Sequence, residues 1–135
     1  MSKTVLYMSM SLDGFIAGPN VGPGNGLGDG GHRLHEWFLT GAGAGHQGAA
    51  DHLTGVNREV MAAGAVVVGR RTFELAGGWG GDHHDGVPIF VLTHDVPDGP
   101  PPGSVRYVTD VHECAAQART VAGDGDVMVH GAGVA

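Results

Sequence analysis

Residues 65–74 read AVVVGRRTFE, and this stretch combines a buried strand, a tight turn and the start of a helix. The valines are β-branched and do not alternate with polar residues, which is typical of a strand covered on both faces in a parallel sheet. Gly69 then lets the chain turn sharply. Arg70, Arg71 and Thr72 follow, where the first N–H groups of a helix lack partners and attract anions, above all phosphate. The alternative interpretation is that both arginines are ordinary solvated surface residues.

Strand and helix patterns alternate along the rest of the chain. Short apolar runs predict strands, and apolar residues at helical spacing predict helices. The predicted strands cover residues 4–10, 65–68, 88–93, 105–108 and 126–130. The predicted helices cover residues 32–39, 51–63 with Gly64 as the stop, a segment from Arg70 that ends by Gly77, and a segment capped by Asp110 that ends at Gly123. This alternation predicts an α/β fold with a mostly parallel central sheet and helices on both faces.

Four turns follow predicted strands and are candidates for ligand binding. They read SLDG, GRRT, LTH and GAG. In parallel sheets ligands collect at the carboxyl ends of the strands. We therefore expect these four turns to share one binding edge.

The loop before residue 32 contains a match to the dinucleotide fingerprint G-x-G-x-x-G at Gly26, Gly28 and Gly31. The fingerprint requires a strand directly before the first glycine and a helix that opens at the third. A long glycine-rich coil precedes it here, so we reject it as a binding motif.

Composition and length limit the class of protein. The chain has 135 residues and is expected to form a single domain. Its 14 acidic residues outnumber its 7 basic ones, which argues against a nucleic-acid or anionic membrane surface. One cysteine, Cys114, excludes an internal disulfide, and no run has the length of a membrane span or the pattern of a signal peptide. A cytoplasmic protein is the expectation.

The motifs MSLDGFIAG, VVVGRRTFE, PIFVLTH and VMVHGAG, in this order and spacing, resemble the dihydrofolate-reductase-like superfamily. They are most similar to the small stand-alone relatives of the reductase domain of riboflavin biosynthesis. The four motifs together cover nearly the whole chain. The resemblance implies a reductase that uses NADPH and transfers a hydride to a small C=N or C=O substrate.

The resemblance also implies which residues bind the cofactor. The phosphate-binding turn of the family matches Gly69, Arg70, Arg71 and Thr72, and the strand end beside the adenosine matches Leu92, Thr93 and His94. The glycine turn on the far side of the cofactor matches Gly131, Ala132 and Gly133. Positions that flank the nicotinamide match Ser9 and Ile16.

Two positions are candidates to orient the substrate or relay a proton. The folate-reducing branch of the family carries a carboxylate early in the helix that here reads LHEWF, and Leu34 takes its place. Folate reduction is therefore disfavoured. Asp13 and Glu36 are the candidates instead, although an aspartate before glycine commonly only forms a turn and a glutamate on a short helix is usually solvated.

The end of the chain also departs from the family pattern. Family members continue past the glycine turn with a helix and further strands, whereas this sequence stops at Ala135. We expect a truncated domain, with an uncovered sheet edge that favours a homodimer, as is common among the relatives.

Two other functions stay open. A nucleotide-binding module without catalysis would use the same turns. A metal-binding protein is suggested by nine histidines, including His32 with His35 and His83 with His84, but no second pair stands at a defined spacing. No metal ligand is therefore assigned.

Overall fold

The computed structural model describes residues 2–39 and 55–131, and they belong to two compact units. The first unit is Met1–Met8 with Ala62–Ala135, and the second is Ser9–Met61. A single domain over residues 1–135 stays a prediction. Each unit is described below by itself.

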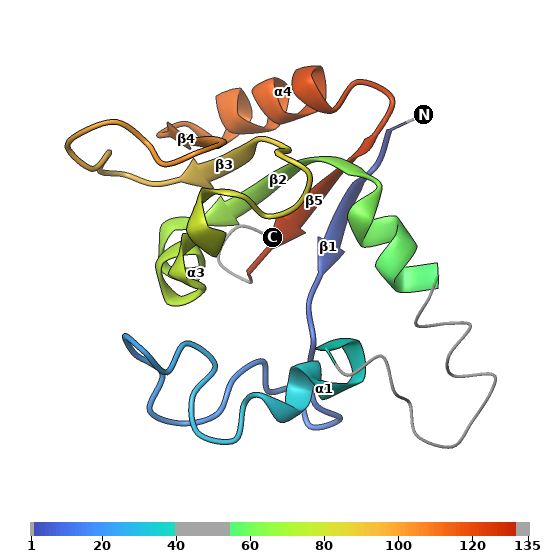
Figure 1. Cartoon of the computed structure of the whole chain (residues 1–135), viewed down its shortest axis with the longest axis vertical. Helices are drawn as coiled ribbons and strands as arrows, with labels where there is room; N and C mark the ends of the chain where they lie inside the picture. The colour runs from blue at the N-terminus through green and yellow to red at the C-terminus, as the bar shows by residue number, and fades with distance from the viewer. Residues whose placement is uncertain (1, 40–54, 132–135) are drawn as a thin grey trace. The chain divides into compact units, whose positions relative to one another are not determined.

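The first unit contains a five-stranded, fully parallel sheet in the order β1-β5-β2-β3-β4 (Figure 1). The strands are β1 (Thr4–Tyr7), β2 (Ala63–Gly69), β3 (Ile89–Leu92), β4 (Val105–Val108) and β5 (Asp126–His130). The three inner strands β5, β2 and β3 are the continuous apolar runs of the sequence, because they are covered on both faces. The α/β fold with a mostly parallel central sheet is confirmed.

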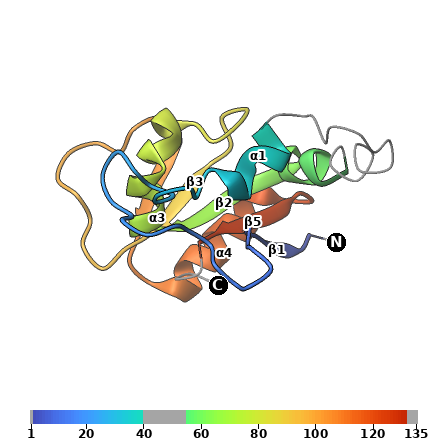
Figure 2. The same ribbon diagram turned by 90° about the horizontal axis from the view of Figure 1, so that it is seen from below.

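Helices lie on both faces of this sheet (Figures 1 and 2). On one face, α4 (Val111–Ala122) packs Cys114 and Ala118 against a core that includes Val67, Phe90 and Val129. On the other face lie α3 (Arg70–Leu75) and the short 3-10 turn η1 (Gly77–Gly81). Side chains alternate along each strand, so neighbouring residues of β2 enter different halves of the core.

The helix α4 begins and ends as the sequence predicts. Asp110 is its N-cap and accepts a hydrogen bond from the N–H of Glu113 at 2.8 Å. Gly123 ends it with a φ of 58°, a conformation that glycine adopts without strain. A side-chain cap of this kind stabilises a helix by about 1 kcal/mol.

The predicted boundary between the second helix and β2 is wrong. The helix covers residues 55–61 of the described chain, and β2 already begins at Ala63, so Gly64 lies inside the strand. The register with β5 shifts between Ala63 and Ala65. A Cβ at Gly64 would lie 2.8 Å from the carbonyl oxygen of Ala122. The glycine therefore permits close approach of β2 to the end of α4 and does not stop a helix.

The first strand is shorter than its predicted range of residues 4–10. β1 pairs only with β5, and Tyr7 lies opposite His130, the last residue of β5. Because β5 ends there, residues after Tyr7 have no strand to pair with. β1 is the outer strand on this side of the sheet, and Leu6 is 49% exposed.

The turn η1 has an unusual backbone geometry. All five residues have positive φ, namely Gly77 (64°), Gly78 (61°), Trp79 (48°), Gly80 (64°) and Gly81 (85°). This left-handed region suits glycine but is uncommon for a bulky residue such as tryptophan. Packing holds the strained Trp79 in place, because its ring contacts Phe73, His83 and His130.

The second unit contains α1 (Arg33–Leu39), as predicted, and a glycine-rich loop closed by its own polar side chains. The Asp29 carboxylate accepts hydrogen bonds from the side-chain amides of Asn20, at 2.6 Å, and Asn25, at 2.9 Å. These bonds lower the pKa of Asp29. Residues 9–32 form no strand beyond one isolated bridge between Gly22 and Asn25. The strand that the dinucleotide fingerprint requires before Gly26 is therefore absent from this described segment.

Candidate functional site

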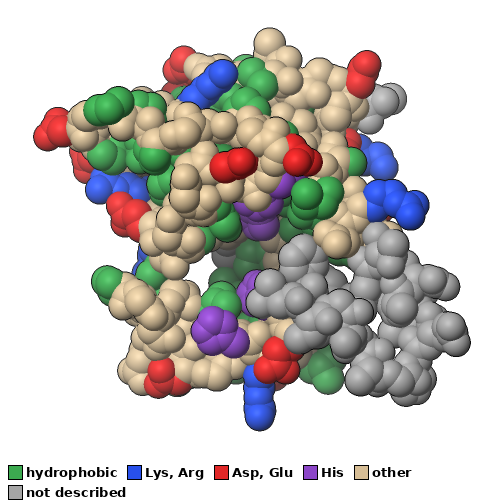
Figure 3. Space-filling model, viewed as in Figure 1, with side chains coloured by type: hydrophobic (Ala, Val, Ile, Leu, Met, Phe, Trp, Pro, Cys, Tyr) green, Lys and Arg blue, Asp and Glu red, His purple; other side chains and the backbone are tan. Residues whose placement is uncertain are grey.

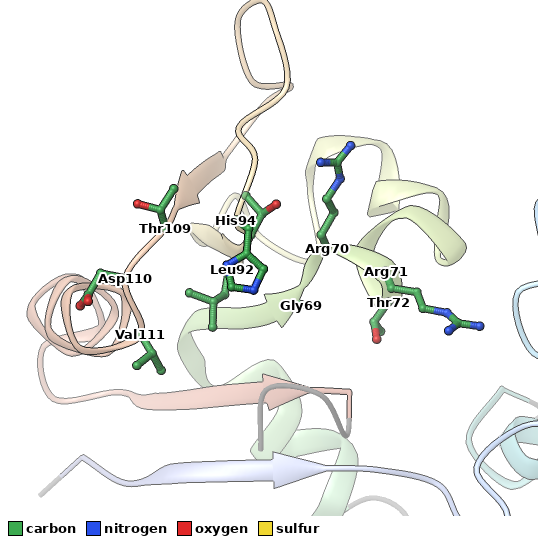
Figure 4. A pocket seen from close by; sticks show the side chains of 10 residues that line it. Gly69, Arg70, Arg71, Thr72, Leu92, His94, Thr109, Asp110 and Val111 are labelled. Carbon is green, nitrogen blue, oxygen red and sulfur yellow. The ribbon is translucent and has the colours of Figure 1, made fainter.

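A pocket of about 520 Å³ lies at the carboxyl edge of the sheet, in the first unit (Figure 4). It is formed where β2, β3 and β4 end, and we call it the arginine pocket. Its lining residues are Gly69, Arg70, Arg71, Thr72, Leu92, Thr93, His94, Thr109, Asp110 and Val111. Two of the turns expected at this edge, GRRT and LTH, therefore meet in one pocket.

Arg70 is held by two acceptors. Its Nε donates to Oε1 of Glu74, one turn later on α3, at 2.7 Å, and its Nη1 donates to the carbonyl oxygen of Asp95 at 3.0 Å. The Glu74 hydrogen bond and charge are the main causes that raise the pKa of the guanidinium. Both side chains of the ion pair are substantially exposed, at 40% and 58%. Arg70 is thus a fixed cation at the pocket wall.

Arg71 is the more open of the two arginines. It is exposed, and no hydrogen bond or ion pair holds its side chain among residues 2–39 and 55–131. The two guanidinium groups point in different directions (Figure 4), so they do not form one bidentate clamp. Any anion that both arginines contact would have to draw at least one of them inward.

The turn after β3 is built by Thr93. Its hydroxyl is buried with the residue, donates to the carbonyl oxygen of Asp95 at 2.9 Å and accepts from the N–H of Asp95 at 3.3 Å. The Asp95 carbonyl therefore binds both Thr93 and Arg70, and joins this turn to the start of α3. His94 is exposed at the pocket, whereas Leu92 is half-buried.

The carboxyl end of β5 lies close to α3. A Cβ at Gly131 would lie 2.5 Å from Oγ1 of Thr72, and Gly131 has a φ of 88°. Only glycine meets both conditions, because the Thr72 side chain fills the space of a Cβ. The binding of cofactor phosphates at this turn stays a prediction. Ala132 and Gly133, the other predicted residues of this turn, lie outside the described residues.

The end of β4 contributes Thr109, Asp110 and Val111, which the sequence analysis did not assign to the site. The sequence could have indicated these residues, because Val105–Val108 was predicted as a strand and its carboxyl end belongs to the same edge of the sheet. The Asp110 carboxylate brings a negative charge to this wall.

Four of the predicted site residues belong to the second unit. Ser9, Asp13, Ile16 and Glu36 lie in Ser9–Met61, so their roles stay predictions. Asp13 accepts a hydrogen bond from Oγ of Ser11 at 2.6 Å, and the Ser11 hydroxyl also binds the backbone of Phe15. This arrangement is a local turn, which agrees with the simpler interpretation of Asp13. Glu36 is exposed in the first turn of α1.

A second polar feature of the first unit is a row of three imidazole rings, which we call the histidine chain. His83 lies between the other two: its Nδ1 is 2.7 Å from Nδ1 of His84, and its Nε2 is 3.0 Å from Nε2 of His130. Nε2 of His84 lies 3.3 Å from the carbonyl oxygen of Ala63. The chain thus runs from the carboxyl end of β5 to the amino end of β2.

The carbonyl of Ala63 determines which ring nitrogens carry protons when all three histidines are neutral. A carbonyl only accepts, so Nε2 of His84 carries its proton and Nδ1 of His84 accepts from His83. Nε2 of His83 is then the acceptor, and His130 donates to it. Burial is the main cause that lowers the pKa of His83 to about 4, followed by the charges that His130 and His84 would carry, while Asp82 opposes the shift. His83 is therefore neutral near pH 7.

The geometry of the histidine chain does not suit one metal ion. His83 turns its two ring nitrogens toward different partners, and one imidazole cannot direct both nitrogens at a single ion. Within residues 2–39 and 55–131, no three His, Cys, Asp or Glu side chains are grouped to hold a metal. In Figure 3 histidine surface appears beside hydrophobic side chains, while Lys and Arg are scattered singly.

A comparison with protein-family models gives no match, and a comparison with curated proteins gives none either. The resemblance to the dihydrofolate-reductase-like superfamily therefore stays a prediction based on the four motifs. In the part of the chain that the structure describes, no helix combines the length and the apolar character needed to cross a membrane.

Proposed function

We propose that this protein is an NADPH-dependent reductase of the dihydrofolate-reductase-like superfamily, which transfers a hydride to a small C=N or C=O substrate. The observation that carries the proposal is the arginine pocket. Two turns that resemble the family's cofactor-binding motifs, GRRT and LTH, meet there at the carboxyl edge of a parallel sheet. Neither the fold nor the pocket volume alone would distinguish this function from others.

The residues of the pocket fit the phosphate and adenosine parts of such a cofactor. Arg70 and Arg71 supply guanidinium donors, which suit phosphate oxygens. Leu92 offers an apolar surface beside the exposed His94. Gly131 lies directly against Thr72, so the glycine turn adjoins the GRRT turn.

Bound NADPH would supply the hydride, so the protein's task is to orient the reacting groups and to exclude water. This division explains why the pocket contains no paired nucleophile and base. Ser9 and Ile16 are proposed to flank the nicotinamide, and Asp13 or Glu36 to orient the substrate or relay a proton.

A fluorescence titration tests the proposal directly. We expect the full chain to bind NADPH more tightly than NADH, because only NADPH carries the 2′-phosphate. Arg70→Ala should reduce this preference about tenfold, which corresponds to one charge-assisted contact. Equal affinity for both dinucleotides, or binding of neither by a folded chain, would contradict the proposal.

A nucleotide-binding module without catalysis is the second candidate. It is favoured by the fact that every residue of the arginine pocket comes from the first unit. Tight NADPH binding with no oxidation of NADPH across a panel of small imines and carbonyl compounds would support this candidate over the reductase.

We also propose a cytoplasmic homodimer. The outer strand β1 leaves one edge of the sheet unpaired among the described residues, and parallel edges of this kind favour association. Cys114 is 1% exposed and unpaired, which fits a reducing compartment. Light scattering on the purified chain measures the oligomeric state.

A further inference from the structure

The surroundings of Arg70 contain more carboxylates than guanidinium groups. Besides the arginine pocket, an adjoining cavity of about 320 Å³ is lined by Arg70, Arg71, Glu74, Leu92, Thr93, His94 and Asp95. Two carboxylates thus stand beside two guanidinium groups, and Asp110 adds a third carboxylate on the wall of the larger pocket. The site therefore has two arginines but no net positive charge.

Glu74 occupies the part of Arg70 that a phosphate would use. A guanidinium binds phosphate best with two parallel N–H groups. In Arg70, Nε is bonded to Glu74 and Nη1 to the carbonyl of Asp95. A phosphate that binds through Nε and the adjacent Nη2 must therefore displace the Glu74 carboxylate.

We propose that Glu74 tunes the selectivity of this pocket for phosphate-bearing ligands by competing with the phosphate for Arg70. The ion pair lies at the surface, where such pairs stabilise a protein only weakly, so displacement of the glutamate costs little. The Glu74 carboxylate would nevertheless stay near the bound phosphate and repel it. The identity of the ligand, NADPH, rests on the proposed function, whereas the competition for Arg70 does not.

Removal of the Glu74 charge is expected to tighten the binding of a phosphate-bearing ligand. In Glu74→Gln the side chain keeps its size but no longer neutralises Arg70 or repels a phosphate dianion. At contact distances in a solvated site, this change corresponds to about tenfold tighter binding of NADPH. NADH has no 2′-phosphate, so its affinity should change less, by about twofold or below.

The experiment uses the full chain and three variants, Glu74→Gln, Arg70→Ala and Asp124→Asn. Asp124→Asn is the matched control, because it removes one exposed negative charge at the amino end of β5, at the opposite edge of the sheet. NADPH and NADH are titrated by fluorescence, and inorganic pyrophosphate by calorimetry. Circular dichroism confirms that each variant is folded.

The expected result is tighter NADPH binding by Glu74→Gln alone, with Asp124→Asn within twofold of the original chain. Unchanged or weaker binding of both NADPH and pyrophosphate by Glu74→Gln would overturn the inference. If neither dinucleotide binds but Glu74→Gln binds pyrophosphate more tightly than the original chain, the inference stands and the proposed function fails. If a folded Glu74→Gln binds none of the three probes, the inference is wrong as well.

Discussion

The arginine pocket and the histidine chain belong to the same unit, yet they hold their polar groups in opposite ways. The Arg70–Glu74 pair is exposed and charged, so water or a ligand can replace either partner at small cost. In the histidine chain, His83 is half-buried and neutral, and both of its ring nitrogens already have partners. The comparison indicates that the pocket is built to exchange partners, whereas the chain is built to keep them.

The largest effect is expected at Gly131, which follows the histidine chain and touches Thr72 of the arginine pocket. Gly131→Ala combines an unfavourable φ with a clash, because its Cβ would lie 2.5 Å from Oγ1 of Thr72. We expect a loss of about 3 kcal/mol in the free energy of unfolding. Gly123→Ala is the control, since its φ is also positive, at 58°, but no atom lies within 4 Å of the new Cβ. It should cost less, about 1–2 kcal/mol, because only the backbone strain remains. Equal losses in urea denaturation would show that Thr72 does not approach Gly131 closely.

Acid should weaken the histidine chain. The pKa of His83 is about 4 in the folded protein, against an ordinary value of 6.5. Between these values the unfolded chain binds more protons, so stability is complete above pH 6.5 and falls as the pH decreases toward 4. Allowing for the partial exposure of the ring, His83 should account for about 2 kcal/mol of this loss. Urea denaturation at pH 7.0, 5.5 and 4.5 measures it.

Replacing His83 separates this effect from general acid denaturation. His83→Gln leaves ring nitrogens of His84 and His130 without their present partner and should cost about 1–2 kcal/mol at pH 7. It should also flatten the pH dependence between 6.5 and 4. His112→Gln, at an exposed position of α4, is the control and should change neither quantity by more than about 0.5 kcal/mol. A pH dependence that survives in His83→Gln would assign it to other groups.

The smallest effect on stability is expected at the Arg70–Glu74 pair. Either Arg70→Ala or Glu74→Gln should change the free energy of unfolding less than His83→Gln does, because both side chains are exposed. The same substitutions are expected to change ligand affinity about tenfold, as described above. A stability loss at Arg70 as large as that at His83 would remove the difference between the two regions.

The sequence predicted the features that depend on neighbouring residues. Apolar runs located β2, β3, β4 and β5, and the cap at Asp110 located α4. The GRRT and LTH turns were found because a parallel sheet brings strand ends to one edge. The prediction for Gly64 was wrong because the sequence does not distinguish a glycine that ends a helix from one that allows close packing of a neighbouring element.

The histidine chain could not be predicted, since its contacts join residues far apart in the sequence. His83 and His130 are 47 positions apart, and His84 and Ala63 are 21 apart. Their meeting depends on how η1 places the following loop on the sheet. In the sequence, the histidines were noticed only as pairs that resemble metal ligands. In the structure, His83 instead forms hydrogen bonds with His84 and His130.

The left-handed turn of η1 has a consequence for the chirality of this segment. Four of its five residues are glycines, which are achiral, so Trp79 alone bears the cost of the left-handed backbone. A backbone of this hand is the ordinary conformation of D-amino acids. In a chemically synthesised chain, D-tryptophan at position 79 would relieve the backbone strain but would redirect the ring that packs against His83 and His130. L-tryptophan therefore places the indole ring against His83 and His130 at the cost of a strained backbone.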